Sequence, residues 1–225
     1  MKRFHRLFLA LALLGCSFGA SAQYYQMANQ LTNLISPALS GSFNYKGYVD
    51  FSGIAGLGTA RANFFGVSTS QGFKYADWFF MGAGMGVDLA MTQKPGNIHE
   101  DPAEYPWMGR KTSSTMAMIP VFSDFRFIIP SGGPDIPGLF IDIKIGASWL
   151  IGDNDLLLDG AHMSHGAQFY LRPQIGLRIP FDSKHPNRAF NIGATYQLIT
   201  SNNFYTPDSD SATLNGIGFT FSYEW

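Results

Sequence analysis

The residues best suited to covalent catalysis lie in the segment 152–165, between two expected strands. There Asp159 precedes His162-Met-Ser-His165. A serine hydroxyl beside an imidazole can act as nucleophile and general base, with a carboxylate to orient the imidazole. A lipid-modifying enzyme could use this segment. A solvated polar loop explains the same residues without catalysis, and we therefore predict no catalytic residue.

A second group of residues has side chains that bind metal ions. His99-Glu-Asp101, together with His162 and His165, offers imidazole and carboxylate ligands that suit divalent ions. Their spacing matches no tight metal motif, so we predict neither a metal nor another cofactor. Gly82-Ala-Gly-Met-Gly86 lacks the spacing of a dinucleotide fingerprint and lies within an expected strand, so it does not predict a nucleotide site.

Ten charged residues alternate with apolar residues along the expected strands. Five are acidic and five are basic: Lys46, Asp50, Asp88, Asp124, Arg126, Asp142, Lys144, Arg172, Arg178 and Glu224. If they face the inside of a narrow barrel they must be paired, because an unpaired buried charge is very costly. A conducting pore would need a wider barrel or a ring of one sign. The balanced set therefore predicts an ion-paired plug in the lumen.

The segment 215–225 best indicates which element positions these residues. Strand side chains alternate between two faces, and in this segment one face is apolar while the other is small or polar. The apolar face carries Ile217, Phe219, Phe221, Tyr223 and Trp225, and the other carries Gly216, Gly218, Thr220, Ser222 and Glu224. This pattern is typical of a bacterial outer-membrane barrel, whose strands turn an apolar face to lipid. An edge strand of a soluble sandwich is the alternative.

Seven further segments show the same alternation, which makes eight expected strands. They span 43–57, 61–75, 79–89, 113–127, 139–149, 168–179 and 190–198. In the second segment Phe64 and Phe65 fall on opposite faces, which predicts a β-bulge there. We expect an all-β fold, an eight-stranded antiparallel transmembrane up-and-down β-barrel over residues 41–225, with a short amphipathic helix before it.

Three observations favour a membrane barrel over a soluble one. The polar faces are rich in glycine, which suits a narrow lumen better than a solvated surface. Short turns at 75–78 and 182–188 alternate with longer loops at 93–112, 152–165 and 201–212, as in outer-membrane barrels. Aromatic residues gather at the short-turn ends, where an interfacial girdle would lie. Outer-membrane lipid is therefore an expected partner.

The N-terminal residues 1–22 have the pattern of a secretory signal peptide. A basic start and an apolar run at 7–14 precede Ala20-Ser-Ala22, which predicts cleavage after Ala22, with lipidation of Cys16 as the alternative. Removing this segment leaves no cysteine and 12 basic against 16 acidic residues, a net charge of −4. Nothing then indicates thiol chemistry or a nucleic-acid partner. The apolar residues of the expected helical segment 23–40 share one face: Met27, Leu31, Leu34 and Ile35.

Four segments carry a resemblance to a known family: Tyr24-Tyr-Gln-Met-Ala-Asn-Gln-Leu31, Ser70-Gln-Gly-Phe-Lys-Tyr75, Phe79-Phe-Met-Gly-Ala-Gly-Met-Gly-Val87 and Ile119-Pro-Val-Phe-Ser-Asp-Phe-Arg126. They resemble the small outer-membrane β-barrel proteins of Bacteroides-like bacteria, an OmpA-type barrel family. The resemblance implies the fold and an outer-membrane location, but that family has no shared catalytic motif.

The final strand also resembles the signal that the barrel-assembly machinery reads, which implies this machinery as a partner during biogenesis. The residues that match are Phe219, Phe221, Tyr223 and Trp225. One feature of that signal, a polar residue two positions before a glycine, is missing whether Gly216 or Gly218 is taken as the glycine. We expect a non-catalytic structural or surface-interaction protein with a charge-plugged lumen. A narrow pore or carrier for a small apolar ligand is the first alternative, and a lipid-modifying enzyme is the second.

Overall fold

The computed structural model describes residues 44–58, 61–76, 78–92, 112–129, 136–158, 161–163, 166–181, 188–200 and 213–225. The predicted signal peptide and the predicted helical segment 23–40 lie outside these residues, as do the loops 93–111 and 201–212. Among the described residues, no helix is long and apolar enough to cross a bilayer.

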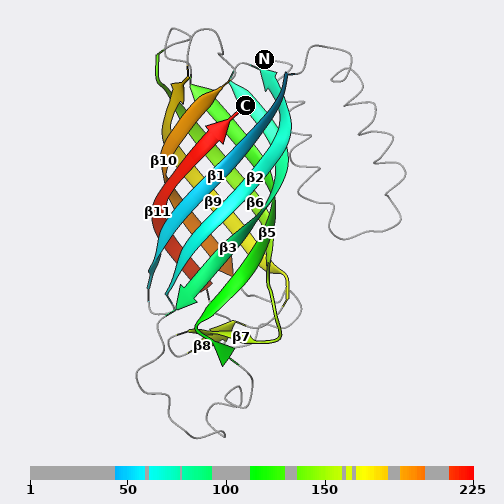
Figure 1. Ribbon diagram of the computed structural model, residues 1–225, viewed down its shortest axis with the longest axis vertical. Coiled ribbons are helices and arrows are strands. Elements are labelled where there is room, and N and C mark those ends of the chain that lie inside the picture. The colour runs from blue at the N-terminus through cyan, green and yellow to red at the C-terminus, as the bar shows by residue number, and fades with distance from the viewer. Residues whose placement is uncertain are drawn as a thin grey trace, which may run out of the picture. The chain divides into compact units, whose positions relative to one another are not determined.

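Eight strands close into a single antiparallel barrel, which confirms the predicted fold class (Figure 1). They are β1 (Asn44–Leu57), β2 (Ala62–Ala76), β3 (Phe79–Thr92), β5 (Thr115–Ile129), β6 (Gly138–Leu150), β9 (Gln168–Pro180), β10 (Ala189–Thr200) and β11 (Thr213–Glu224). Each pairs with its sequence neighbours in the barrel, and β1 pairs with β11 to close the cylinder. A closed barrel leaves no strand edge unpaired, which is the condition for a sheet to enter a bilayer.

The two ends of the barrel differ. β1 begins and β11 finishes at one end, called here the terminal end; the opposite end, called here the loop end, carries a small separate sheet (Figure 1). This sheet contains β4 (Thr112–Ser113), β7 (Asp155–Leu158) and β8 (Ala161–Met163), with β7 and β8 paired as a hairpin. The sequence predicted only a loop over 152–165, because three consecutive leucines at 156–158 show no alternation that would indicate a strand.

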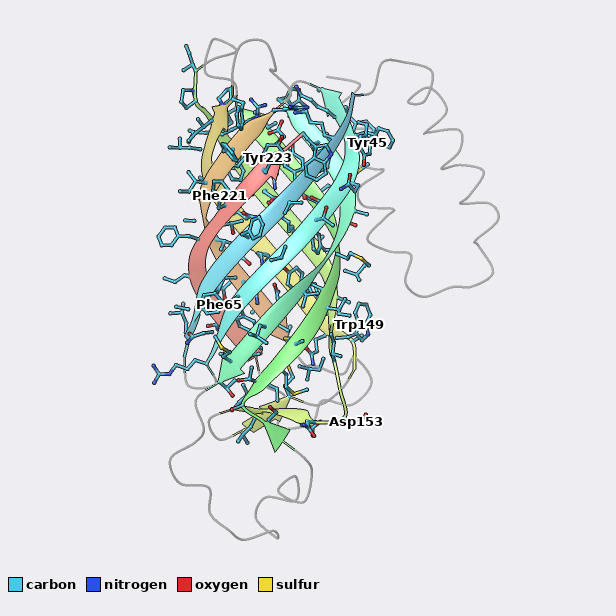
Figure 2. All side chains as sticks on the ribbon, viewed as in Figure 1. Tyr45, Phe65, Trp149, Asp153, Phe221 and Tyr223 are labelled. Carbon is cyan, nitrogen blue, oxygen red and sulfur yellow. The ribbon has the colours of Figure 1, made fainter. Side chains whose placement is uncertain are left out.

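Side chains alternate between the lumen and the outer surface along every barrel strand. Many outward positions are large and apolar; Phe219 is 72% exposed, whereas Glu224 on the same strand is fully buried. Figure 2 shows Phe65, Trp149 and Phe221 projecting away from the outside of the barrel. An exposed apolar belt of this kind is the lipid-facing surface expected of a transmembrane barrel.

The predicted bulge at Phe64 and Phe65 is wrong. Both residues lie in a continuous register with β3, opposite Ala90 and Leu89, and the register shift on β2 falls between Lys74 and Ala76 instead. Phe64 points inward and is fully buried, while Phe65 points outward and is 58% exposed. The alternation is therefore regular, and what breaks the polar–apolar pattern is an apolar residue inside the barrel.

Aromatic rings line the terminal end of the strands. Trp78 stacks on Phe127 with ring centroids 6.2 Å apart, and Phe190 lies 5.2 Å from Phe221 and 4.9 Å from Phe181. Trp and Tyr favour the interface between water and bilayer because their rings are apolar with a polar edge. The same end of the barrel is where the sequence predicts an interfacial girdle.

Glycines on the lumen face make room for interior rings. A Cβ atom on Gly84 would lie 2.6 Å from the ring of Phe122, and one on Gly82 would lie 2.7 Å from the ring of Phe80. These distances are below ordinary van der Waals contact, so a larger residue would displace the rings. The glycine-rich polar face is thus a packing surface of the lumen.

Candidate functional site in the barrel interior

The inward-facing residues of β1 lie along the interior from one end of the barrel to the other. From the terminal end they are Lys46, Tyr48, Asp50, Ser52 and Ile54, all of them buried. Charged and polar residues come first in this order, and an apolar residue comes last. The interior therefore changes from charged to apolar on the way to the loop end.

The layer nearest the terminal end is centred on Glu224. Arg178 donates from Nε to Glu224 Oε2 (2.9 Å) and from Nη2 to Oε1 (3.0 Å), a bidentate contact. Lys46 also donates to Glu224 Oε1. Arg178 keeps 15% of its side chain exposed, so the positive charge of this layer reaches the solvent at the barrel end.

The central layer joins β1, β5 and β6. Asp142 accepts hydrogen bonds from Arg126 (2.9 Å) and Lys144 (2.6 Å). Asp50 lies 3.1 Å from Lys144 and 3.5 Å from Arg126, and Asp124 lies 3.9 Å from Lys144. All five side chains are at most 1% exposed. Buried charges at these distances are stable only when each is compensated by its neighbours.

Aromatic rings support the central layer on the side of the terminal end. The Arg126 guanidinium carbon lies 3.8 Å from the centroid of the Tyr48 ring, and Tyr48 packs edge-on against Phe80 with centroids 4.9 Å apart. A desolvated guanidinium over an aromatic face is a favourable cation–π contact. The rings also fill the space between the central layer and the Glu224 layer.

The third charged layer contains Arg172 and Asp88. Arg172 donates to Asp88 Oδ2 (2.6 Å), to Ser52 Oγ (3.2 Å) and, through Nε, to Gln197 Oε1 (2.8 Å). These partners come from β3, β1 and β10, whereas Arg172 lies on β9. One guanidinium therefore ties four strands together across the lumen.

The structure places all ten of the charged residues singled out in the sequence inside the barrel and brings them into these three layers. Direct opposition on adjacent strands explains some of the ion pairs, since Arg126 on β5 lies opposite Asp142 on β6. It does not explain others, since Arg172 lies opposite Lys144 in register yet binds Asp88 across the lumen. Alternation therefore indicates which residues point inward, but partners depend on the closed barrel.

The loop end of the lumen is apolar, although the sequence pattern does not predict an apolar layer there. Its buried cluster contains Ile54, Ala62, Phe64, Ala90, Met116, Met118, Phe122, Leu150, Leu156, Leu158, Met163, Tyr170, Ile199 and Leu214. The sequence carries one sign of this apolar layer, namely bulky residues at polar-face positions near strand ends. They are Phe64, Met116, Met118 and Tyr170.

The β7–β8 hairpin closes this apolar layer. Its side chains Leu156, Leu158 and Met163 are fully buried within the same cluster. Thr92 at the end of β3 anchors the hairpin, because its hydroxyl donates to the carbonyl of Leu157. Its amide donates to the carbonyl of Ser114 (2.7 Å), which directly follows β4, the strand that pairs with β7. The hairpin thus acts as an apolar cap on the loop end of the barrel.

Replacing Phe64 with alanine is expected to lower the free energy of unfolding by about 3–5 kcal/mol, because the substitution leaves a cavity in the apolar layer. Denaturant unfolding in detergent micelles measures the loss. The adjacent Phe65→Ala is the matched control, since Phe65 lies on the same strand but on the outer surface. Equal losses for the two variants would contradict the assignment of an apolar interior at this end.

The residues considered for catalysis and metal binding lie largely outside the described part of the chain. Asp159, Ser164, His165 and the segment 99–101 are not described, and His162 is described only as a backbone position in β8. Among the residues that the structure describes, no three histidine, cysteine or acidic side chains are grouped to hold a metal ion. The described interior offers packed ion pairs and apolar contacts.

The fold is similar to that of several solved structures. Neither a protein-family model nor a curated protein matches the chain. The structure is similar to that of Neisserial surface protein A, with a TM-score of 0.51 at 8% identity over 82% of this chain and 98% of that one. Others include the outer membrane enzyme PagL (TM-score 0.48, 12% identity, 77% and 97% coverage) and the outer membrane protein OprG from Pseudomonas aeruginosa (0.40, 8%, 78% and 95%). Together, closure, alternation and the outward apolar belt define a small eight-stranded β-barrel of the transmembrane type.

Proposed function

We propose that this protein is an integral outer-membrane barrel with a structural or surface-interaction role, that it is not a catalyst, and that its lumen is closed. The observation that carries the proposal is the layered interior. Three ion-paired layers and one apolar layer follow one another along the lumen, and nearly all of their side chains are buried. A barrel packed in this way offers no aqueous route to solutes, since small barrels are just filled by their own side chains.

The proposed orientation places the terminal end toward the periplasm and the loop end toward the exterior. Outer-membrane barrels join their strands by short turns on the periplasmic side and by longer loops outside. Here β2 ends at Ala76 and β3 begins at Phe79 at the terminal end, whereas β3 and β5 are separated by residues 93–114 at the loop end. The surface role would then lie with the loop-end segments.

The same proposal includes secretion through a signal peptide cleaved after Ala22, membership of the Bacteroides-like OmpA-type family and delivery by the barrel-assembly machinery. They depend on the sequence pattern and on the outward aromatic face of β11. Phe219 and Phe221 are exposed on that face, while Tyr223 and Trp225 are half-buried at the terminal end.

The test combines location with conductance. Cell fractionation should recover the protein in the outer membrane with heat-modifiable migration on gels, and the purified barrel should conduct almost nothing in planar bilayers. Recovery from the soluble periplasm would contradict the membrane location. A large and steady conductance would contradict the closed lumen.

A carrier for a small apolar ligand is the second candidate, and the apolar layer favours it. Met116, Met118 and Met163 lie in that layer, and methionine side chains adapt readily to different apolar shapes. A ligand would have to displace the β7–β8 hairpin. Native mass spectrometry of the protein extracted from membranes distinguishes the candidates, because only a carrier would retain an apolar small molecule in defined ratio.

A further inference from the structure

The central layer contains one more acid than base. Asp50, Asp124 and Asp142 share the space with Arg126 and Lys144 only. If all five groups were charged, this fully buried layer would carry one uncompensated negative charge. Such a charge is costly in a desolvated interior, and the usual remedy is that the group binds a proton.

Neither adjacent layer supplies the missing positive charge. Asp88 is already neutralised by Arg172 at 2.6 Å. On the other side, Lys46 and Arg178 both bind Glu224, in a separate layer nearer the terminal end of the barrel. The imbalance therefore belongs to the central layer.

Asp124 is the least compensated of the three acids. Its distance to Lys144 is 3.9 Å, against 2.6 Å for Asp142 and 3.1 Å for Asp50. Arg126 contacts Asp142 and Asp50, and the only hydrogen bond that Asp124 accepts from the described residues is from the hydroxyl of Ser70 (2.5 Å). A hydroxyl can donate and accept, so Ser70 is a compatible partner for a neutral carboxylic acid as well as for a carboxylate.

The carboxyl groups of Asp124 and Asp142 lie close together, because both face the Lys144 ammonium, with their Oδ2 atoms 3.9 Å and 2.6 Å from its Nζ atom. Each has a buried Oδ1 atom that accepts no hydrogen bond from the described residues. Two ionised carboxylates would repel at this separation, and neither could donate. A single proton between them removes the repulsion and creates a hydrogen bond, as in other carboxyl pairs that share one site.

Among the residues that the structure describes, the groups around Asp124 leave no other source of compensation. β6 presents Lys144 and Asp142, β1 presents Asp50 and Tyr48, β5 itself presents Arg126, β2 presents Ser70, and β3 presents Gly82 directly opposite. A metal ion would need a cluster of ligands, and no such cluster occurs among the described residues. The remaining ligand for the acidic excess is a proton.

We propose that Asp124 and Asp142 form a proton-binding carboxyl pair in the barrel interior. At neutral pH the proton stays on Asp124, which donates a hydrogen bond to the carboxylate of Asp142. Asp142 remains the charged acceptor for Arg126 and Lys144. The central layer is then neutral, with Asp50 and Asp142 balancing the two bases.

Infrared spectroscopy of the full-length protein in detergent tests the pair directly. At pH 7 the wild type should show the C=O stretch of a protonated carboxylic acid, shifted by 13C labelling of aspartate, and Asp124→Asn should lose this band. Asp88→Asn is the control that should keep it, because Asp88 is paired one to one with Arg172. Absence of the band from the wild type would overturn the proposal, and a cation-dependent stability in its place would assign the site to a bound metal cation.

The dependence of stability on pH provides a second measurement. The folded state would hold a proton that the unfolded chain releases above the acid range, so the unfolding midpoint of the wild type should fall as pH rises toward the loss of that proton. Asp124→Asn, whose amide can donate to Asp142 in the same way, should keep its stability and lack this component of the fall. Asp142→Asn should be destabilised at every pH, because it removes the acceptor of Arg126 and Lys144. If Asp124→Asn were as unstable as Asp142→Asn and kept the wild-type pH profile, the pair would be excluded.

Discussion

Replacing Arg172 with alanine is expected to lower the free energy of unfolding by about 3–5 kcal/mol, the typical effect of removing one partner of a buried ion pair. The substitution leaves Asp88 charged and fully buried, and it also removes hydrogen bonds to Ser52 and Gln197. Denaturant unfolding in detergent measures the loss. Planar-bilayer recordings on the same variant should reveal small ionic currents that the wild type lacks, because the layer nearest the apolar cap would be opened.

Two controls distinguish the lost ion pair from general damage. Arg178→Ala removes a charge that is partly solvated, and should therefore cost less than Arg172→Ala. The double variant Asp88→Ala/Arg172→Ala should recover part of the loss, because no uncompensated charge remains, and the double-mutant cycle gives the coupling between the two residues. Additive losses in that cycle, together with a large and steady wild-type conductance that Arg172→Ala leaves unchanged, would contradict the plug.

Deleting residues 221–225 is expected to abolish assembly, leaving an unfolded and protease-sensitive chain. The deletion removes the pairing of Phe221, Ser222, Tyr223 and Glu224 with β1, and with it part of the seam that closes the barrel. It also removes two backbone hydrogen bonds between Trp225 and Gly47 (3.1 and 3.2 Å) and the acceptor of Arg178. Surface protease digestion and heat-modifiable migration report the outcome, and normal surface levels of the truncated chain would contradict it.

A matched variant separates the seam from the aromatic signal. Phe221→Ala/Tyr223→Ala keeps the backbone pairing with β1 and keeps the buried Glu224, but it loses two outward rings of the proposed assembly signal. Failure of this variant to assemble in cells, combined with normal refolding of the purified chain into detergent, would assign the loss to recognition by the assembly machinery. Normal assembly would assign the effect of the deletion to the seam.

The sequence by itself determined which residues face inward along most of each strand. Alternation has a period of two and is a local property, so Asp142 and Lys144 on β6 could be placed in the lumen from their spacing alone. The fold class followed in the same way, because eight such strands with one apolar face can bury their backbone in a membrane only by closing.

Only the tertiary structure decided the partners and the apolar layer. Asp88 and Arg172 are 84 positions apart and lie on non-adjacent strands, so their contact exists only once the barrel is closed. The apolar cap was hidden for a related reason. Phe64 looked like an apolar residue out of phase on the polar face, because local alternation cannot indicate that Leu156 and Leu158 of the β7–β8 hairpin would cover it. Period and polarity are set within a strand, whereas pairing across a lumen depends on shear, closure and the packing of segments distant in the chain.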